Sequence, residues 1–384
     1  MKNFGYVILG YMSLVALSFI DNGRGAVYPE LLRFFSIGPD KGSLIFSLMS
    51  ITSVLAYLST SLWLPRLGPV VSTRVAMIMM AIGTYGIGAG GDFQNFDLSL
   101  VFGALAGFGF GITGITMNFM VDSGAPPFQK RRFLSGLHGA YGLSSLLAPQ
   151  LLSLFLYVNL SWIHYFKFLA IPCAIVLIYS FFTHDSHHQD IKENHGTMKD
   201  AFFMNLLIGL FAGCYVASEI MVSSRIKYYL VEAHGFSEYV ANNYLSYFFL
   251  FLMIGRLGFA FFRIELESKK LIIISLVSTL ICFSLGEIHQ IFYAMTGLFM
   301  SFCFPVIVDW ISNSFPKKNH VVLGSTMSYI GVGIAVMHFI FGAIADRFGA
   351  GNAFYLFYLL NIGSMVSFFI AMSLVKRYHQ NESL

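Results

Sequence analysis

Long uninterrupted apolar stretches run through this chain from end to end, and they constrain its fold more than any other feature. A helix needs roughly 20 consecutive apolar residues to cross the hydrocarbon of a bilayer. Stretches of about this size lie near residues 5–34, 43–64, 71–91, 98–122, 134–157, 162–182, 200–230, 240–262, 270–286, 290–311, 321–345 and 352–375. The charged fraction of 11% gives too little polar surface for a soluble domain of 384 residues. We therefore predict an all-α polytopic membrane protein with twelve transmembrane helices.

A short pattern occurs twice in the chain, 187 positions apart (309 minus 122). Val121-Asp122 precedes Phe128-Gln129-Lys130-Arg131, and Val308-Asp309 precedes Phe315-Pro316-Lys317-Lys318. In both copies an apolar stretch ends in an acid, a basic turn follows, and another apolar stretch begins. This duplicated hairpin predicts two parallel halves, an arrangement typical of secondary transporters whose substrate site lies between the halves.

One long polar interval, from Thr183 to Lys199, divides the chain into nearly equal halves. We predict an N-terminal six-helix bundle over residues 1–182, a cytoplasmic linker over 183–199 and a C-terminal six-helix bundle over 200–384. Potential metal ligands in the interval are His184, Asp185, His187, His188, Asp190, Glu193 and His195. A binding site needs fixed geometry, and this segment has no pattern that would fold alone, so we interpret it as a solvated linker without a metal site.

Lysine and arginine are distributed unequally between the two sides of the predicted bundle. When both termini are placed on one side, fifteen of these residues fall on that side and four on the other. Because basic residues are enriched in cytoplasmic loops, we expect both termini in the cytoplasm, with the protein in a bacterial inner (plasma) membrane. The net charge of +4 then reflects topology and does not indicate nucleic-acid binding. We expect a monomer without a cofactor.

Ionisable side chains inside predicted spans are costly and therefore mark candidate functional sites. Asp21 lies near the middle of the first span, and Arg24 shares its helical face three residues later. This pair is either a proton-loading carboxylate with its counter-ion or a static ion pair. Glu219 lies mid-span in the seventh helix, and we expect no partner for it three or four residues away. Because low dielectric favours the neutral form of an unpaired carboxylate, we predict Asp21 and Glu219 as the proton-coupling residues.

Other polar residues within the spans are candidates for contact with a solute. Arg225 lies further toward the outer end of the seventh helix, where it either snorkels or meets an anionic group. Asn118, His138 and His338 either recognise a hydroxylated solute or form interhelical hydrogen bonds. Aromatic faces for a sugar-like or planar ligand are available at Tyr28, Tyr141, Phe304 and Trp310. The predicted substrate-binding residues are Arg24, Asn118, His138, Tyr141, Arg225, Phe304 and His338.

Charged residues at the ends of spans suit gating better than solute binding. Asp122 and Asp309 end the two copies of the duplicated pattern, and we predict that they clasp the basic turns at 130–132 and 317–318 when the cytoplasmic side is closed. Arg256 and Lys167 are expected to serve helix ends in the same way. The predicted gating residues are Arg66, Asp122, Arg131, Asp309, Lys317, Asp346 and Arg347.

Several of these residues lie in motifs that resemble those of the major facilitator superfamily, and within it the fucose permease-like sugar:proton symporter group. The run HGAYGLSSLLAP at 138–149 is similar to that group's fifth-span motif. Asn118, Glu219 and Gly255-Arg256 match residues usual in its fourth, seventh and eighth spans. The run GAIADRFG at 342–349 resembles the superfamily's G-x-x-x-D-R-x-G signature. The resemblance covers the whole chain.

The resemblance implies alternating access by two pseudo-symmetric six-helix bundles, with the first, fourth, seventh and tenth helices lining the cavity. Asp21 then falls where fucose permease carries its first-helix proton-linked aspartate. Three residues or segments of this sequence depart from the family's pattern, and these departures bear on which substrate is carried and how many protons are coupled. The loop around Arg66 lacks the usual acid of the signature, Gly114 stands about where fucose permease has a second acid, and Arg225 stands where relatives often have Trp.

The leading hypothesis is a secondary active transporter that moves a small polar solute, a sugar or a related hydroxylated compound, by proton symport, with sodium as the alternative ion. Arg24 and Arg225 favour a second hypothesis, in which the cargo is an organic anion or a metal-chelating acid. A third is a transporter-shaped membrane sensor that moves nothing, although the linker and tails are short for the soluble domain that such proteins usually append. The sequence has no nucleophile elbow or phosphate loop, so we do not expect an enzyme.

Overall fold

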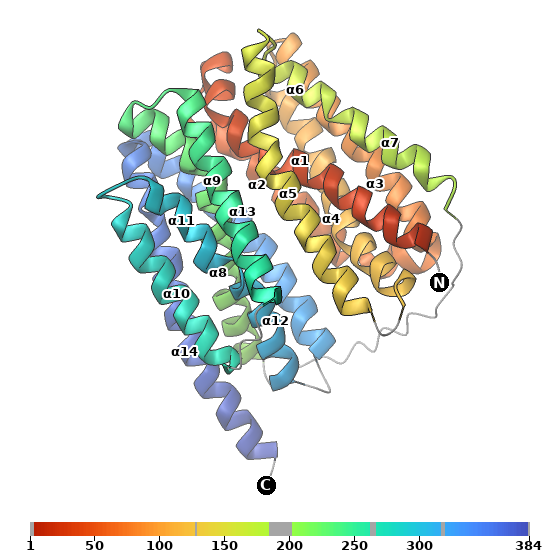
Figure 1. Cartoon of the computed structure of the whole chain (residues 1–384), viewed down its shortest axis with the longest axis vertical. Coiled ribbons are helices and arrows are strands. Elements are labelled where there is room, and N and C mark those ends of the chain that lie inside the picture. Colours follow the sequence, from red (N-terminus) through yellow and green to blue (C-terminus); the bar gives the residue numbers. More distant parts are fainter. Residues whose placement is uncertain (1–3, 127–128, 184–201, 262–265, 316–318, 383–384) are drawn as a thin grey trace.

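The computed structural model describes residues 4–126, 129–183, 202–261, 266–315 and 319–382. The predicted linker after Thr183 and the predicted gating residue Lys317 therefore lie outside the described residues. The described chain is almost entirely helical (Figure 1). Its helices are α1 (Phe4–Phe35), α2 (Pro39–Leu58), α3 (Thr60–Asp92), α4 (Phe96–Gly124), α5 (Lys130–Tyr157), α6 (Trp162–Phe168), α7 (Ala170–Ser180), α8 (Phe202–His234), α9 (Glu238–Phe261), α10 (Ser268–Leu285), α11 (Ile291–Met300), α12 (Cys303–Ser314), α13 (Asn319–Phe354) and α14 (Leu356–Glu382).

These helices confirm the predicted all-α membrane fold with twelve spans. The sixth span consists of α6 followed by α7, and the tenth consists of α11 followed by α12. Within the described ranges, eleven segments are long and apolar enough to cross a membrane. The remaining span, α9, is 24 residues long.

Proline explains where the two divided spans break. Helix α6 ends at Phe168, four residues before Pro172, and α11 ends at Met300, close to Ser301, which is four residues before Pro305. Because proline has no backbone N–H, it cannot bond to the carbonyl four residues earlier, and the helix is interrupted there.

The backbone bends sharply at two glycines, one in α3 and one in α13. Gly68 bends α3 with a φ of 71°, and Gly349 bends α13 with a φ of 84°. Only glycine adopts this combination of positive φ and extended ψ without strain. The second predicted span accordingly ends at Leu58 rather than near residue 64, because the chain turns at Ser59 and residues 60–67 form a separate helical segment before the bend.

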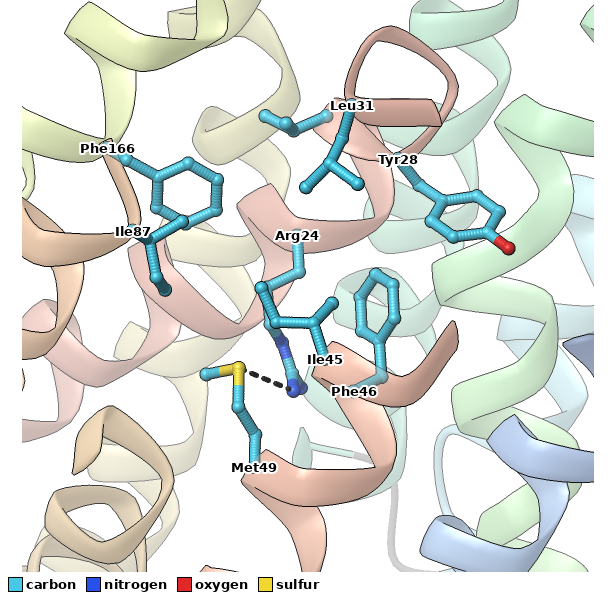
Figure 2. A pocket seen from close by; sticks show the side chains of 9 residues that line it. Arg24, Tyr28, Leu31, Ile45, Phe46, Met49, Ile87 and Phe166 are labelled. Carbon is cyan, nitrogen blue, oxygen red and sulfur yellow. Dashed lines mark hydrogen bonds between the residues drawn. The ribbon is translucent and has the colours of Figure 1, made fainter. Parts of the chain in front are cut away.

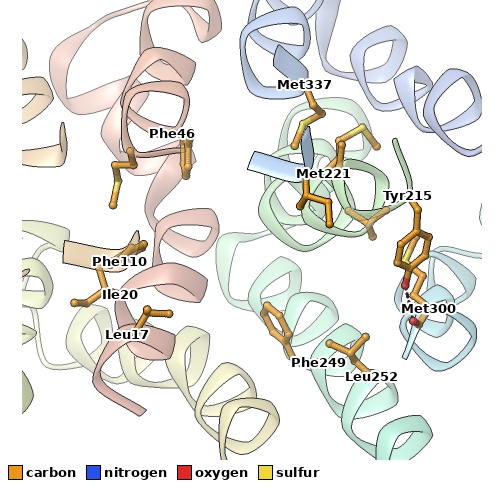
Figure 3. Packing of buried hydrophobic residues seen from close by; sticks show 14 of the residues in the cluster. Leu17, Ile20, Phe46, Phe110, Tyr215, Met221, Phe249, Leu252, Met300 and Met337 are labelled. Carbon is orange, nitrogen blue, oxygen red and sulfur yellow. Dashed lines mark hydrogen bonds between the residues drawn. The ribbon is translucent and has the colours of Figure 1, made fainter. Parts of the chain in front are cut away.

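The two halves of the chain lie side by side. Figure 1 shows α1 to α7, in red to yellow-green, on one side and α8 to α14, in green to blue, on the other. Each half contributes its own apolar residues to the core: Figure 3 shows Leu17, Ile20, Phe46 and Phe110 apart from Met221, Met300 and Met337. Across the boundary α2 packs against α13, α5 against α9 and α1 against α8.

Polar contacts join the halves at the end of the spans that lies away from the two termini, which we call the far end. Ser47 Oγ donates to the carbonyl of Ala335 (3.1 Å), and Gln150 Nε2 donates to Ser246 Oγ (2.8 Å). Helices α1 and α8 approach so closely there that a Cβ added to Gly25 would lie 2.8 Å from the Cα atom of Ser224. The structure is therefore closed between the halves at the far end.

Candidate functional site

Asp21 is the centre of a hydrogen-bonded cluster on α1. Its Oδ1 forms an ion pair with the Arg24 guanidinium, as the spacing of three residues predicts. Its Oδ2 accepts a hydrogen bond from the Tyr141 hydroxyl of α5 (3.0 Å). Both carboxylate oxygens are therefore engaged, by a fixed cation on the same helix and by a neutral donor on another.

Glu219 has partners, so the expectation of an unpaired carboxylate is wrong. Tyr215, one turn earlier on α8, places its hydroxyl 2.8 Å from Glu219 Oε2, and Arg256 of α9 places Nη2 3.4 Å from Oε1. The prediction overlooked Tyr215 because a tyrosine carries no charge. It assigned Arg256 to a helix end, whereas this residue lies within α9 and faces the acid of the seventh span.

The Tyr215 hydroxyl also lies 2.6 Å from the carbonyl of Met300, the last residue of α11. A tyrosine has one hydroxyl hydrogen and so donates to one of these two acceptors at a time. A protonated Glu219 would donate to Tyr215 while Tyr215 donates to Met300, and an ionised Glu219 retains Arg256. The geometry thus offers partners to both protonation states of Glu219.

The two acid clusters come from opposite halves and meet at one point. The Arg256 guanidinium lies 6.0 Å from the centre of the Tyr141 ring, within the range of a cation–π contact. Tyr141 therefore connects to Asp21 through its hydroxyl and to Arg256 through its ring. The side chains of Asp21 and Glu219 remain 17% and 12% exposed, so neither acid is completely buried.

Arg225 is fully buried, so the alternative in which it snorkels to the outer surface is wrong. Its guanidinium lies 4.0 Å from the ring centre of Tyr28, 4.4 Å from Phe46 and 4.8 Å from Phe341. Its Nη2 lies 3.2 Å from Ser43 Oγ and 3.2 Å from His338 Nδ1. Tyr28, Ser43 and Phe46 belong to the first half, so Arg225 crosses the boundary between the halves.

A charged network around Lys227 was not predicted as part of any site. The buried Nζ atom bonds to the carbonyl of Ala26 (2.6 Å) and to Glu30 Oε1 (2.5 Å), and lies 3.5 Å from Glu238 Oε2. Glu238 also forms an ion pair with Arg33. The network links α1 to α8 and α9 at the far end, and these partners lie on different helices, so no local spacing indicates them.

Three other predicted substrate residues are not brought into these clusters. The Asn118 amide donates to the carbonyl of Gly114 in its own helix (2.9 Å), so the alternative of an interhelical hydrogen bond is wrong. Phe304 is partly buried in α12. The backbone of His138 lies in α5, but its side chain is outside the described residues.

The predicted gating residues lie at the two ends of the bundle. At the end near the termini, Lys130 Nζ donates to Asp122 Oδ2 (2.8 Å) and Ser268 Oγ donates to Asp309 Oδ2 (2.5 Å). Each contact stays within one half. Arg66 is exposed at this end, and the Arg131 side chain is outside the described residues. The contact of Asp122 with its basic turn is thus present, and its gating role remains a prediction.

Asp346 and Arg347 lie at the far end and are exposed. A Cβ added to Gly38 would lie 2.3 Å from Asp346 Oδ1, so this carboxylate from the second half adjoins the N-terminus of α2 in the first half. A helix N-terminus favours a nearby negative charge. Lys167, as expected, serves a helix end, where it forms an ion pair with Asp92.

A small pocket lies beside the Asp21 cluster, among α1, α2, α3 and α6. Figure 2 shows Arg24 reaching toward Met49, whose sulfur lies 3.7 Å from Nη1. The other residues that line it are Val27, Tyr28, Leu31, Ile45, Phe46, Ile87 and Phe166. The lining is apolar apart from Arg24 and the Tyr28 hydroxyl, so the pocket has few groups to orient a polar solute.

Comparison with known proteins identifies the family. The family model described as Major Facilitator Superfamily matches residues 9–324. This chain belongs to the major facilitator superfamily. The prediction from its motifs is thereby confirmed at the level of the superfamily.

One yeast protein and several solved structures resemble most of the chain. Bypass of stop codon protein 6 from Saccharomyces cerevisiae is 25% identical over 395 residues, which cover 89% of this chain and 77% of the yeast protein. The crystal structure of a D-xylose–proton symporter superposes with a TM-score of 0.77 at 13% identity and covers 96% of this chain and 97% of the other.

Two further solved structures share the fold. The nucleoside transporter NupG, in a variant form, has a TM-score of 0.75 at 13% identity and covers 97% of this chain and 99% of its own. The inward-open xylose transporter XylE from E. coli has a TM-score of 0.75 at 13% identity, with 96% and 95% covered. At this identity the superpositions establish the major facilitator fold and leave the solute open.

Proposed function

We propose that this protein is a proton-coupled secondary transporter of a small polar solute, a sugar or a related hydroxylated compound. The observation that carries the proposal is the meeting of two acid clusters from opposite halves, Asp21 with Arg24 and Tyr141, and Glu219 with Arg256 and Tyr215. Ionisable groups inside a membrane span are expensive and are retained where they carry protons or bind solute. The fold shared with a D-xylose–proton symporter and a nucleoside transporter supports this class of cargo.

Each cluster surrounds its carboxylate with a cation and a tyrosine hydroxyl. A carboxylate that alternates between two protonation states requires partners in both, and Glu219 has Arg256 for the ionised state and Tyr215 for the neutral one. Protonation of Asp21 would weaken its attraction for Arg24 and leave the guanidinium free for a solute oxygen. We propose that this exchange couples proton binding to solute binding at the boundary between the halves.

We further propose that the termini and the end near them face the cytoplasm, as the excess of lysine and arginine there supports. The far end, which is closed by the contacts of Lys227 and Ser47, then faces outward. In this assignment the structure is closed on the outward side. Alternating access requires that the far-end contacts separate in another state.

The test is uptake of radiolabelled D-xylose, D-glucose, uridine and D-glucuronate into proteoliposomes under an imposed pH gradient, acid outside. We expect at least one of these solutes to accumulate, and Asp21→Asn or Glu219→Gln to abolish the part that depends on the gradient. Glu232→Gln, which removes an exposed acid from the same helix as Glu219, is the matched control and should leave uptake unchanged. Full gradient-driven uptake by both Asp21→Asn and Glu219→Gln would overturn the coupling assignment.

A further inference from the structure

Arg225 has no counter-ion in the part of the chain that the structure describes. The nearby acids are already paired, Asp21 with Arg24, Glu219 with Arg256 and Glu30 with Lys227. Two of its guanidinium nitrogens, Nε and Nη1, are buried without a hydrogen-bond partner. A buried cation without a paired anion is energetically costly. The aromatic faces of Tyr28, Phe46 and Phe341 offset part of this cost through cation–π contacts.

His338 adds another donor beside this cation. Its Nδ1 lies 3.2 Å from Arg225 Nη2, and a guanidinium can donate but not accept, so Nδ1 is the acceptor of this bond. A neutral imidazole then carries its hydrogen on Nε2, which is buried and has no partner. The cluster therefore presents unpaired donors at three positions, Arg225 Nε, Arg225 Nη1 and His338 Nε2, and all of them suit an acceptor or an anion.

The groups that now cover this cluster belong to the opposite half. Tyr28 and Phe46 cover the guanidinium, Ser43 accepts from Nη2, and the His338 ring stacks on Phe46 at 5.0 Å. When the halves separate at the far end, Arg225 loses these partners and keeps Phe341 and His338. Its donors then face the opening, six residues along α8 from Glu219, which is about 9 Å at the helical rise.

We propose that Arg225 and His338 form a recognition site for a carboxylate on the transported solute, which makes the cargo a hydroxylated carboxylic acid such as a sugar acid. This inference rests on the proposed transport function and names its substrate class. A carboxylate carries one negative charge, which matches the single uncompensated guanidinium, and it pairs with arginine through two parallel hydrogen bonds. A phosphate monoester carries nearly twice that charge and matches the site less well.

The experiment measures binding to the purified full-length protein by thermal stabilisation, since a ligand raises stability according to its occupancy. The probes are matched pairs, D-glucuronate with D-glucose and D-galacturonate with D-galactose, together with glucose 6-phosphate. We expect at least one uronate to bind at least tenfold more tightly than its neutral partner and more tightly than the phosphate. A wild-type protein that binds the neutral sugars as tightly as the uronates, or binds no uronate, overturns the proposal without any variant.

Variants then assign the preference to Arg225. Arg225→Gln should remove the preference for the uronate, and Arg225→Lys, which keeps the charge but not the paired donors, should reduce it. Lys41→Gln removes an exposed cation from α2 near the same end and should keep the preference. An Arg225→Gln protein that is folded and still prefers the uronate tenfold contradicts the assignment.

The uptake and binding results together distinguish the carboxylate site from proton-coupled transport. Gradient-driven uptake of a neutral sugar without binding of uronates would overturn the carboxylate site and leave proton-coupled transport standing. Uronate binding that depends on Arg225, without any gradient-driven uptake of the same uronate, would support the site and overturn proton coupling.

Discussion

Tyr215 shows how one neutral side chain defines the chemistry of a buried acid. Its single hydroxyl hydrogen serves two acceptors, Glu219 Oε2 at 2.8 Å and the Met300 carbonyl at 2.6 Å. The protonation state of Glu219 decides which of them receives it. Because Met300 ends α11, a proton on Glu219 changes the bonding at the break in the tenth span.

The Glu219–Arg256 pair gives a prediction for stability. Arg256→Gln should destabilise the protein by about 3 kcal/mol, because removing one partner of a buried pair leaves an uncompensated charge. The double variant Glu219→Gln with Arg256→Gln should recover most of this loss, since no charge remains unpaired. Thermal unfolding in detergent measures both.

The single variants and the double variant form a double-mutant cycle, which gives the interaction energy between Glu219 and Arg256. A double variant as unstable as Arg256→Gln alone would show that Arg256 stabilises the fold independently of Glu219. Recovery of stability without recovery of gradient-driven uptake would separate the fold from the proposed coupling.

The residues of the site were predictable where their partners are close in sequence. Asp21 and Arg24 are three positions apart on one helix, so helical periodicity pairs them directly. The partner of Glu219 lies 37 positions away on another helix. A single sequence carries no information about which faces of α8 and α9 meet, so Arg256 was assigned to a helix end.

At the scale of the helices, breaks and bends arise from single residues. Pro172 and Pro305 divide the sixth and tenth spans, and these breaks follow from the missing N–H group. The bends at Gly68 and Gly349 were not predicted, although Gly349 is the last residue of the signature that the sequence analysis identified. Its φ of 84° supplies the physical reason for glycine at this position.

Replacing Gly349 tests whether the bend in α13 requires glycine. Gly349→Ala should destabilise the protein by about 1–3 kcal/mol, because alanine is strained at its backbone angles although no atom lies within 4 Å of the added Cβ. Gly351→Ala is the matched control, since it also has open space but no positive φ. Thermal unfolding in detergent should show a loss for the first and none for the second. Equal effects would show that the bend does not need glycine.

At the scale of the whole molecule, the halves and the number of spans were predictable from hydropathy and the duplicated pattern. The closure of the far end was not, because it depends on contacts between helices from different halves. Lys227 joins Glu30 and Glu238 there, and Arg225 inserts between α1 and α2. Both cations lie on α8, which makes this helix the main charged link to the first half.

Removing Lys227 should loosen this closure. Lys227→Met leaves Glu30 and Glu238 without their shared cation, so we expect the far end to open more often. A cysteine introduced by Ser47→Cys lies buried at the far end and reports opening through its rate of maleimide labelling. The rate should rise several-fold when Lys227→Met is added, whereas Lys41→Gln should leave it unchanged. An unchanged rate with Lys227→Met would show that this network does not hold the halves together.

The central claim is that protons and solute move together through Asp21 and Glu219. The most direct measurement is the external pH of a weakly buffered suspension of proteoliposomes when a transported solute is added without an imposed gradient. We predict that the medium becomes more alkaline with the wild-type protein and with Glu232→Gln, and that Asp21→Asn and Glu219→Gln abolish this change. Solute entry without any change in external pH would contradict the account.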